Sequence, residues 1–264
     1  MRLKITHRTE YNYEQPVPYT LQRVRLMPAS GSTQTVQSWD LDVEGAREEV
    51  RFVDHLGNDT RLYSITDGPT QMAIVARGEV DTRDTAGVYG RHLGFAPLWL
   101  FQRETPLTAA GERVHALAEE LGEGGSEIDR LHRLMAAVAG KVMYQAGATD
   151  TATMAEQVMA SGKGVCQDHA HVFIATARRL GFPARYVSGY LMLATTEQTA
   201  SHAWAEAHVP SLGWVAFDPS NGISPDERYV RLAVGRDYRE AMPVTGIRLG
   251  QAAERLEVRI TVEQ

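Results

Sequence analysis

Residues 162–190 read GKGVCQDHAHVFIATARRLGFPARYVSGY and contain the only cysteine of the chain, Cys166. Two glycines precede this cysteine in the turn, and an apolar run follows it. After Cys166, the residues Ala170, Phe173 and Ala177 recur at the spacing of one helix face, and neighbouring positions are apolar as well. The stretch therefore predicts a largely buried helix that begins at Cys166 and ends at the Gly-Phe-Pro sequence that follows it.

A cysteine in the first turn of a helix is well placed to be a nucleophile. The thiolate is the reactive form, and the unpaired amides and dipole of a helix N-terminus favour negative charge. Gly162 and Gly164 allow a tight turn and the close approach of a substrate carbonyl, whose oxyanion the Cys166 amide would receive. The alternative for a lone cysteine is a buried structural residue.

Two later motifs supply partners for this cysteine. His202 lies in SHAWAEAHV, and Asp218 ends the apolar run of GWVAFDPSNG. Each has a structural alternative, because a histidine can be a hydrogen-bonded core residue and an aspartate before proline often only forms a turn. Together with Cys166 they make the material of a Cys-His-Asp triad, in which the carboxylate fixes the imidazole tautomer.

Other polar residues beside Cys166 suggest different roles. Asp168 is a rival for the orienting carboxylate, but two residues after Cys166 on one helix it more naturally serves the helix N-terminus. His169 and His171 raise the possibility of a metal site with Cys166. We expect no metal and no other cofactor, because His171 should point away from Cys166 and no ligand pair has recognised zinc spacing.

The composition is that of an ordinary globular protein. The 264 residues are 43% hydrophobic and 23% charged, with a formal net charge of -6. The chain shows no clustered basic excess, so a nucleic-acid partner is not expected. It also contains no run of about 20 apolar residues and no signal-like start, so we expect no membrane partner and a cytoplasmic location. The single cysteine agrees with a reducing compartment.

Hydrophobic periodicity divides the chain into parts. Residues 1–82 alternate with period two between Gly- and Pro-containing turns, which predicts an antiparallel β domain, arranged as a small sandwich. Residues 83–106 form a glycine- and proline-rich connector, and residues 107–240 combine helical and strand patterns in a catalytic core. Residues 241–264 end in a strictly alternating strand that must pair with one of the two domains.

These motifs resemble the transglutaminase-like superfamily, in which cysteine, histidine and aspartate occur in this order on a helix start and two successive strands. The opening THRTEYNYEQPV and the late AVGRDYREAMPVTGIRLG are similar to the bacterial branch with its own N-terminal β domain. The resemblance implies an α+β fold with a papain-like core, whose nucleophile begins a helix packed on an antiparallel sheet. It assigns Cys166 as nucleophile, His202 as general base and Asp218 as orienting carboxylate.

The resemblance also implies an activity. Members of this branch are cysteine peptidases or amidases, whereas mammalian-type relatives cross-link glutamine to lysine with calcium, for which this sequence has no binding loop. A second oxyanion donor is an upstream aromatic residue, for which Tyr144 is the candidate. We expect hydrolysis of a peptide or amide through a thioester. Transamidation and a non-catalytic peptide-binding module are the alternatives, and the oligomeric state is open.

Overall fold

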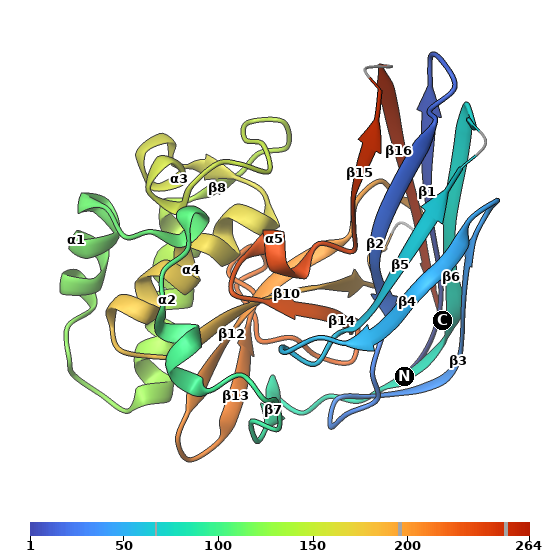
Figure 1. Cartoon of the computed structure of the whole chain (residues 1–264). Coiled ribbons are helices and arrows are strands. Elements are labelled where there is room, and N and C mark those ends of the chain that lie inside the picture. Colours follow the sequence, from blue (N-terminus) through green and yellow to red (C-terminus); the bar gives the residue numbers. More distant parts are fainter. Residues whose placement is uncertain (67, 195–196, 251–252) are drawn as a thin grey trace.

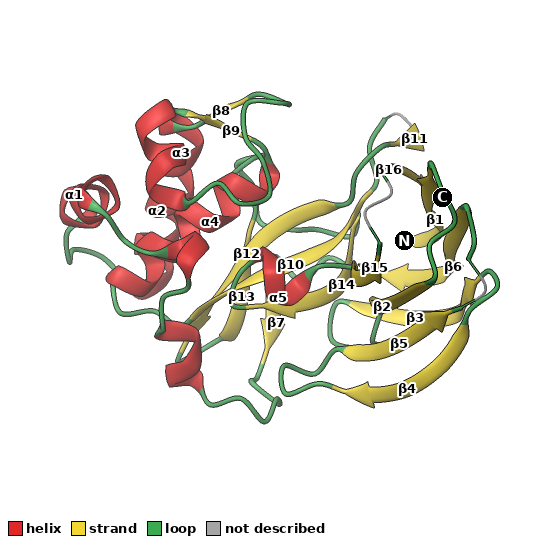
Figure 2. Ribbon diagram, turned by 45° about the horizontal axis from the view of Figure 1, so that its top comes forward, coloured by secondary structure: helices red, strands yellow, loops and turns green. Residues whose placement is uncertain are grey.

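The structure is a computed structural model, and it describes residues 1–66, 68–194, 197–250 and 253–264. Most of its regular elements are strands, and its few helices gather on one side of the molecule (Figure 1). All three large sheets are antiparallel, as the α+β prediction requires. Figure 2 shows the helices at one end and the strand-only part at the other.

Two sheets build the strand-only part and share one hydrophobic core. In the first, the spatial order is β11 (Glu197–Gln198), β16 (Glu254–Glu263), β1 (Arg2–Tyr13), β6 (Gln71–Thr82) and β3 (Gln34–Val43). In the second, the order is β15 (Val244–Leu249), β2 (Tyr19–Met27), β5 (Asp59–Ile65) and β4 (Arg47–Val53).

The period-two pattern of the sequence has a direct structural cause in β1. Leu3 and Ile5 are fully buried, whereas Lys4 between them is exposed. Successive side chains of a strand point to opposite faces, so one face of β1 enters the core and the other meets solvent. The alternation predicted from the sequence for this strand is therefore confirmed.

The strand expected near the C-terminus pairs with β1. It is β16, which lies antiparallel to β1 with Lys4 opposite Glu263 and Tyr13 opposite Glu254. Before it, β15 pairs with β2 along the register from Val244 to Leu249. Residues from both ends of the sequence therefore build the same two sheets.

A third sheet and the helices form the rest of the molecule. The sheet has the order β14 (Tyr229–Gly235), β10 (Ala184–Leu191), β12 (His202–Val209), β13 (Gly213–Phe217) and β7 (Val88–Gly90), so β14 and β7 are its edges. The short strands β8 (Met143–Tyr144) and β9 (Lys163–Gly164) pair in parallel. The helices are α1 (Glu112–Leu121), α2 (Glu127–Lys141), α3 (Ala155–Ser161), α4 (Cys166–Arg179) and α5 (Tyr238–Ala241), with 3-10 turns at Leu98–Gln102 and Pro106–Thr108.

Helix α4 is the central helix and begins at Cys166, as the sequence predicts. Every residue from Asp168 to Arg178 is buried, because the sheet lies on one side of α4 and other helices pack around it. The alanines 203, 205 and 207 of β12 share the core with α4. Their small side chains let the helix backbone approach the strand closely.

The segment between the two parts is more ordered than a connector. Within residues 83–106, β7 pairs with β13, with Val88 opposite Val215. The aromatic and aliphatic residues 98–101 that follow differ in burial. Phe101 is buried, whereas Trp99 is 58% exposed. Residues 83–106 therefore contribute an edge strand and the core side chains of Ala96 and Phe101 to the helix-bearing part.

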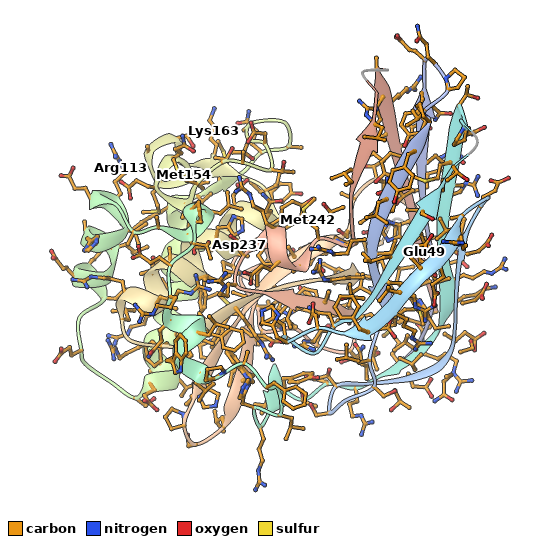
Figure 3. The ribbon with its side chains drawn as sticks, viewed as in Figure 1. Glu49, Arg113, Met154, Lys163, Asp237 and Met242 are labelled. Atoms are coloured by element: carbon orange, nitrogen blue, oxygen red, sulfur yellow. The ribbon has the colours of Figure 1, made fainter. Side chains whose placement is uncertain are left out.

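The short helix α5 lies where the two parts meet. Figure 3 shows Asp237 and Met242, which flank α5, between the helices and the strand-only part. Ser188 of β10 donates to the Ala241 carbonyl at 2.7 Å, and the amide of Tyr238 donates to His171 at 3.1 Å. Strand β10 and helix α4 therefore both hold α5.

A buried guanidinium ties α4 to several loops. Arg178 is 6% exposed and donates to the Phe101 carbonyl at 2.8 Å, the Thr108 hydroxyl at 2.6 Å, the Ala184 carbonyl at 2.9 Å and the Arg236 carbonyl at 2.6 Å. Burial lowers the pKa of Arg178 to about 10, so the side chain keeps its charge at neutral pH. No carboxylate is needed here, because carbonyl dipoles and a hydroxyl satisfy the donors.

We expect Arg178→Lys to lower the free energy of unfolding by about 2–4 kcal/mol, because one ammonium cannot reach all the acceptors of a guanidinium. Urea titration of the purified variant measures this loss. Arg179→Lys is the matched control, since Arg179 is exposed at the next position of the same helix. Equal stability of the two variants would contradict the role given to Arg178.

Candidate active site

The chain reaches Cys166 through a tight turn that two glycines make possible. Gly162 ends α3 with φ +65, a left-handed conformation that glycine adopts at little cost. At Gly164, an added Cβ would lie 2.6 Å from the Cβ of Asp168, so a larger residue would collide with the first turn of α4. The turn thus presents Cys166 as the first residue of α4, where it is partly exposed and not in a disulfide.

Asp168 serves the helix start, as the sequence predicts. Its carboxylate is fully buried and accepts from the Val165 amide at 2.8 Å and from the Thr149 hydroxyl at 2.6 Å. Both bonds use Oδ2, and Oδ1 has no hydrogen-bond partner among the described residues. Burial raises the pKa of Asp168 despite these bonds. Asp168 therefore fixes the loop before Cys166 and is not the group that meets His202.

Both histidines of α4 have structural partners. His169 places Nδ1 at 2.8 Å from the Val165 carbonyl and Nε2 at 2.8 Å from the Val142 carbonyl. His171 accepts from the Tyr238 amide at 3.1 Å, and burial, followed by the charge of Arg178, lowers its pKa to about 3. In the part of the chain that the structure describes, no group of three or more His, Cys, Asp and Glu residues could hold a metal ion.

The structure brings Cys166, His202 and Asp218 together from α4, the start of β12 and the residue after β13. His202 Nε2 lies 2.6 Å from Asp218 Oδ2, and Cys166 is close enough to the imidazole for its charge to raise the pKa of His202. Because Nε2 faces the carboxylate, Nδ1 is the ring nitrogen left for the thiol. The fold thus joins the cysteine, histidine and aspartate that the sequence singles out.

The electrostatics of this cluster favour a charged imidazole. Burial alone would lower the pKa of His202, but hydrogen bonds to Asp218 and Cys166 and their charges raise it to about 10. Burial would raise the pKa of Asp218, but the bond and charge of His202, with bonds from Ser220 and Asn221, lower it to about 2. At neutral pH the pair is therefore an imidazolium beside a carboxylate.

Several hydrogen-bond donors to Asp218 could not be predicted from the sequence. Ser220 donates its hydroxyl to Oδ1 at 2.6 Å, Asn221 donates its amide group to Oδ2 at 2.7 Å, and Tyr229 donates its hydroxyl to Oδ2 at 2.9 Å. The Ser-Asn-Gly sequence after Pro219 indicates only a turn. Nothing near Tyr229 in the sequence indicates that it contacts Asp218, since the contact depends on how β14 lies in the fold.

A cavity of about 790 Å³ opens beside Cys166 and His202. Aromatic and aliphatic side chains line part of it, including Tyr186, Tyr238 and Leu191. Apart from Cys166 and His202, the polar lining consists of hydroxyl and amide groups, and no Asp, Glu, Lys or Arg side chain belongs to the described lining. An uncharged group can therefore enter without leaving a buried charge unpaired.

Tyr144 also lines this cavity. Strand β8 sets its position, because Tyr144 pairs with Gly164, two residues before Cys166. Its ring stacks on the ring of His169, with the two centroids 6.3 Å apart. The residue is nevertheless 58% exposed to solvent. Burial, then the charges of Cys166 and Asp218, raises the pKa of Tyr144, so the phenol keeps its proton and can donate.

Comparison with known proteins agrees with this architecture. The profile described as "Transglutaminase-like superfamily" matches residues 115–219, and the profile described as "Bacterial transglutaminase-like N-terminal region" matches residues 3–81. The chain belongs to the transglutaminase-like superfamily, in the bacterial branch with its own N-terminal region. The family predicted from the sequence is confirmed.

Individual relatives resemble the chain over its length. Protein ML0607 of Mycobacterium leprae is 27% identical, with 99% of this chain and 98% of that protein covered. Protein Mb2599c of Mycobacterium bovis is 27% identical, with 93% and 87% covered. A solved structure described as a "Putative Cysteine Protease" from Cytophaga hutchinsonii has a TM-score of 0.78 at 23% identity, covering 100% of this chain and 91% of that one, which shows a shared fold.

The raised pKa of His202 predicts a pH-dependent contribution to stability. A group whose pKa is higher in the folded than in the unfolded state stabilises the fold fully below the unfolded value and loses this effect through the folded value. The stability difference between wild type and His202→Ala should therefore be largest below pH 6.5 and shrink as the pH rises through about 10. Urea titrations from about pH 6 to about pH 10.5 measure it.

The Asp218→Asn background is the control for this prediction. There the carboxylate that stabilises the imidazolium is absent, so deletion of the His202 side chain should show much less of the pH trend. A difference between wild type and His202→Ala that stays constant across the range would contradict the charge assignment.

Proposed function

We propose that the protein is a thiol-dependent hydrolase of peptide or amide bonds, with Cys166 as nucleophile, His202 as acid and base, and Asp218 as orienting carboxylate. The observation that carries the proposal is that one imidazole lies 2.6 Å from Asp218 and also next to Cys166, at the edge of the cavity of about 790 Å³. This is the arrangement that thiol acyl transfer needs.

The reaction starts from the ion pair, in which His202 holds the proton as an imidazolium and Cys166 is the thiolate. The sulfur forms a bond to the amide carbonyl carbon, and the carbonyl oxygen takes up the electron pair as an oxyanion. The Cys166 amide has no intrahelical acceptor at the first helix position and donates to this oxyanion, with Tyr144 as the second donor. As the carbon–nitrogen bond breaks, His202 returns the proton to the leaving amine, and a thioester is left.

In the second half a water molecule replaces the amine. His202 removes a proton from the water, the oxygen attacks the thioester carbon, and the carbon–sulfur bond breaks. The thiolate leaves, the carboxylic acid is released, and Cys166 and His202 return to their starting state. Asp218 stays ionised throughout, because it accepts the hydrogen bond of the imidazole and takes no proton itself.

The lining of the cavity supports water as the acyl acceptor. A lysine amine would arrive as an ammonium, and no described lining residue is a carboxylate that would pair with it. Transamidation uses the same triad and is the second candidate. A non-catalytic peptide-binding module is a third, and the presence of the cysteine, histidine and aspartate in contact argues against it.

The proposal also includes the arrangement of the two parts of the fold and the location of the protein. We propose that the two sheets with a common core are a β-sandwich domain and that α4 with its sheet is a papain-like core. In the described part of the chain, no helix is long and apolar enough to cross a membrane. The cytoplasmic location, the peptide or amide substrate and the absence of a nucleic-acid partner stay predictions.

The proposed ion pair predicts a reactive thiol at acidic pH. At about pH 5.5, iodoacetamide should modify Cys166 at least ~10-fold faster than it modifies glutathione, because the imidazolium stabilises the thiolate. Mass spectrometry of the intact protein follows the reaction without ambiguity, since the chain has one cysteine. His202→Ala should lose the advantage. A wild-type rate no higher than that of glutathione would refute an activated nucleophile.

Hydrolysis and transfer can be separated with a peptide pool. Incubation with the enzyme should release free acids from amide or peptide bonds, and an added primary amine should leave these products largely unchanged. Cys166→Ala should lower the rate at least ~1,000-fold, because covalent catalysis is lost. Amine incorporation without hydrolysis, read by mass spectrometry, would favour the transamidation alternative instead.

A further inference from the structure

The Asp218 carboxylate is fully buried and shared among several donors. Oδ1 accepts from the turn that follows it, through the amide and hydroxyl of Ser220. Oδ2 accepts from His202 at 2.6 Å and from Asn221 at 2.7 Å, and also from the hydroxyl of Tyr229 at 2.9 Å. Tyr229 therefore bonds the same oxygen atom that bonds the imidazole.

Tyr229 can act only as a donor at this position. Burial, followed by the charge and hydrogen bond of Asp218, raises the pKa of Tyr229, so the phenol keeps its proton. Its ring meets His202 edge-on with centroids 5.8 Å apart, and meets Trp204 edge-on with centroids 5.5 Å apart. The hydroxyl thus has a fixed direction toward Oδ2, and the ring packs against the imidazole that Oδ2 orients.

Tyr229 begins β14, and the strand-only part of the molecule holds this strand. β14 is an edge of its sheet, so one side of its backbone has no neighbour among the described strands. Gln34 of β3 supplies partners there, donating to the Arg231 carbonyl at 2.8 Å and accepting from the Arg231 amide at 2.7 Å. Gln34 is 2% exposed, so this contact is closed to solvent.

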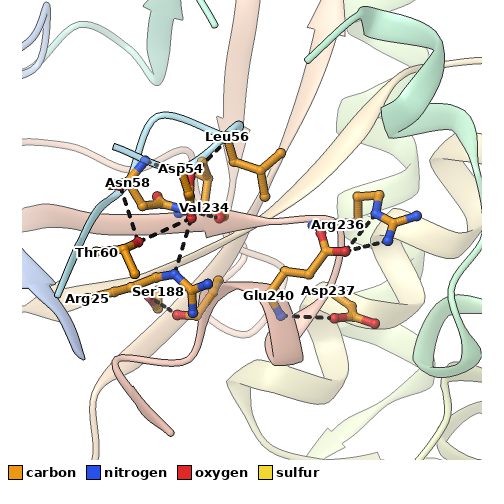
Figure 4. Close-up of polar contacts among 11 residues, drawn as sticks. Arg25, Asp54, Leu56, Asn58, Thr60, Ser188, Val234, Arg236, Asp237 and Glu240 are labelled. Atoms are coloured by element: carbon orange, nitrogen blue, oxygen red, sulfur yellow. Dashed lines mark hydrogen bonds and ion pairs between the residues drawn. The ribbon is translucent and has the colours of Figure 1, made fainter. Parts of the chain in front are cut away.

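Asn58, between β4 and β5, repeats the arrangement further along β14. It donates to the Val234 carbonyl at 2.8 Å and accepts from the Val234 amide at 2.8 Å (Figure 4). Asp54 fixes Asn58, accepting from its backbone amide and its side chain, each at 3.0 Å, and Arg25 pairs with Asp54 at 3.3 Å. Two buried side-chain amides therefore imitate the missing strand neighbour of β14.

We propose that Tyr229 is a positioning residue that shares the Asp218 carboxylate with His202, and that Gln34 and Asn58 hold it there from the N-terminal sheets. The inference rests on the proposed function, because it assigns Tyr229 a role in the Cys166–His202–Asp218 group. It gives the N-terminal sheets a part in the site that their distance from Cys166 in the sequence does not suggest.

The hydrogen bond from the Tyr229 hydroxyl should reduce the electrostatic stabilisation that Asp218 gives to the His202 imidazolium. A donor stabilises the charged carboxylate, so less of its charge acts on His202. Without this donor, the carboxylate stabilises the imidazolium more strongly, and His202 should lose its proton at a higher pH. A loosened site would have the opposite effect. A carboxylate that moves away from the imidazolium stabilises it less, so the pKa of His202 would fall toward the ordinary value of histidine.

The test follows the alkylation rate of Cys166 by iodoacetamide against pH in the full chain. In the wild type the rate should rise in two steps, one when the thiolate forms beside the imidazolium and one near pH 10, when His202 loses its proton. Tyr229→Phe removes the hydroxyl and keeps the ring. It should move the second step upward by about one pH unit. An unmoved or lowered step would overturn the inference.

Tyr190→Phe is the matched control. Tyr190 lies in β10, is 1% exposed, and its hydroxyl lies 3.0 Å from His7 Nδ1, without contact to Asp218. This variant should leave both steps in place, and a shift equal to that of Tyr229→Phe would overturn the inference. A wild type without a step that depends on His202 would overturn the proposed function as well, so the two failures are distinguishable.

Gln34→Met tests the link to the N-terminal sheets. Loss of the amide should loosen β14 and withdraw Tyr229 from Asp218, so the second step should move upward as in Tyr229→Phe. The double variant should show no further shift, because both changes remove the same donor. Additive shifts, or no shift in a Gln34→Met protein whose circular dichroism matches the wild type at each pH, would overturn the link.

Discussion

The site depends on the need to satisfy a buried carboxylate. Asp218 has no solvent exposure, and an ionised carboxylate away from water is tolerated only when hydrogen bonds and opposite charge surround it. Its donors come from β12, from the turn after β13 and from β14, through His202, Asn221 and Tyr229. Strands that pair differently would leave this charge without partners. The carboxylate that orients the imidazole thereby also favours one arrangement of the sheet.

The small residues of β12 explain how a helix start can meet a strand start. Alanines at 203, 205 and 207 let α4 lie directly on the sheet, and the first residue of α4 then reaches His202. Gly189 of β10, which pairs with His202 of β12, is a second place where a small residue is needed. An added Cβ there would lie 2.2 Å from the Val230 carbonyl oxygen and 2.5 Å from the Trp204 ring. Small side chains on both strands therefore make room for the imidazole and its aromatic neighbours.

The sequence predicts what depends on local pattern and fails where contacts depend on topology. Cys166, His202 and Asp218 stand out because a helix start and two strand ends have recognisable local signals, and Asp168 is correctly placed at the helix start. Tyr229 has no such signal. Its contact requires knowing that β14 lies beside β10, at the edge of the sheet, which depends on non-local pairing. The strand inside residues 83–106 is missed for a different reason, because β7 has only three residues and so no recognisable alternation.

The pairing of β16 with β1 has a consequence for the order of folding. Lys4 lies opposite Glu263, so one edge of β1 gains its partner only from the far end of the sequence, whereas β6 pairs with the other edge. Such long-range pairing closes a large loop and is slow to form. Until then the sheet that contains β3 and Gln34 lacks inner strand β16. We expect the sheet that contains β1 to be completed only after residues 254–263 have been made, so its assembly is among the last steps of folding.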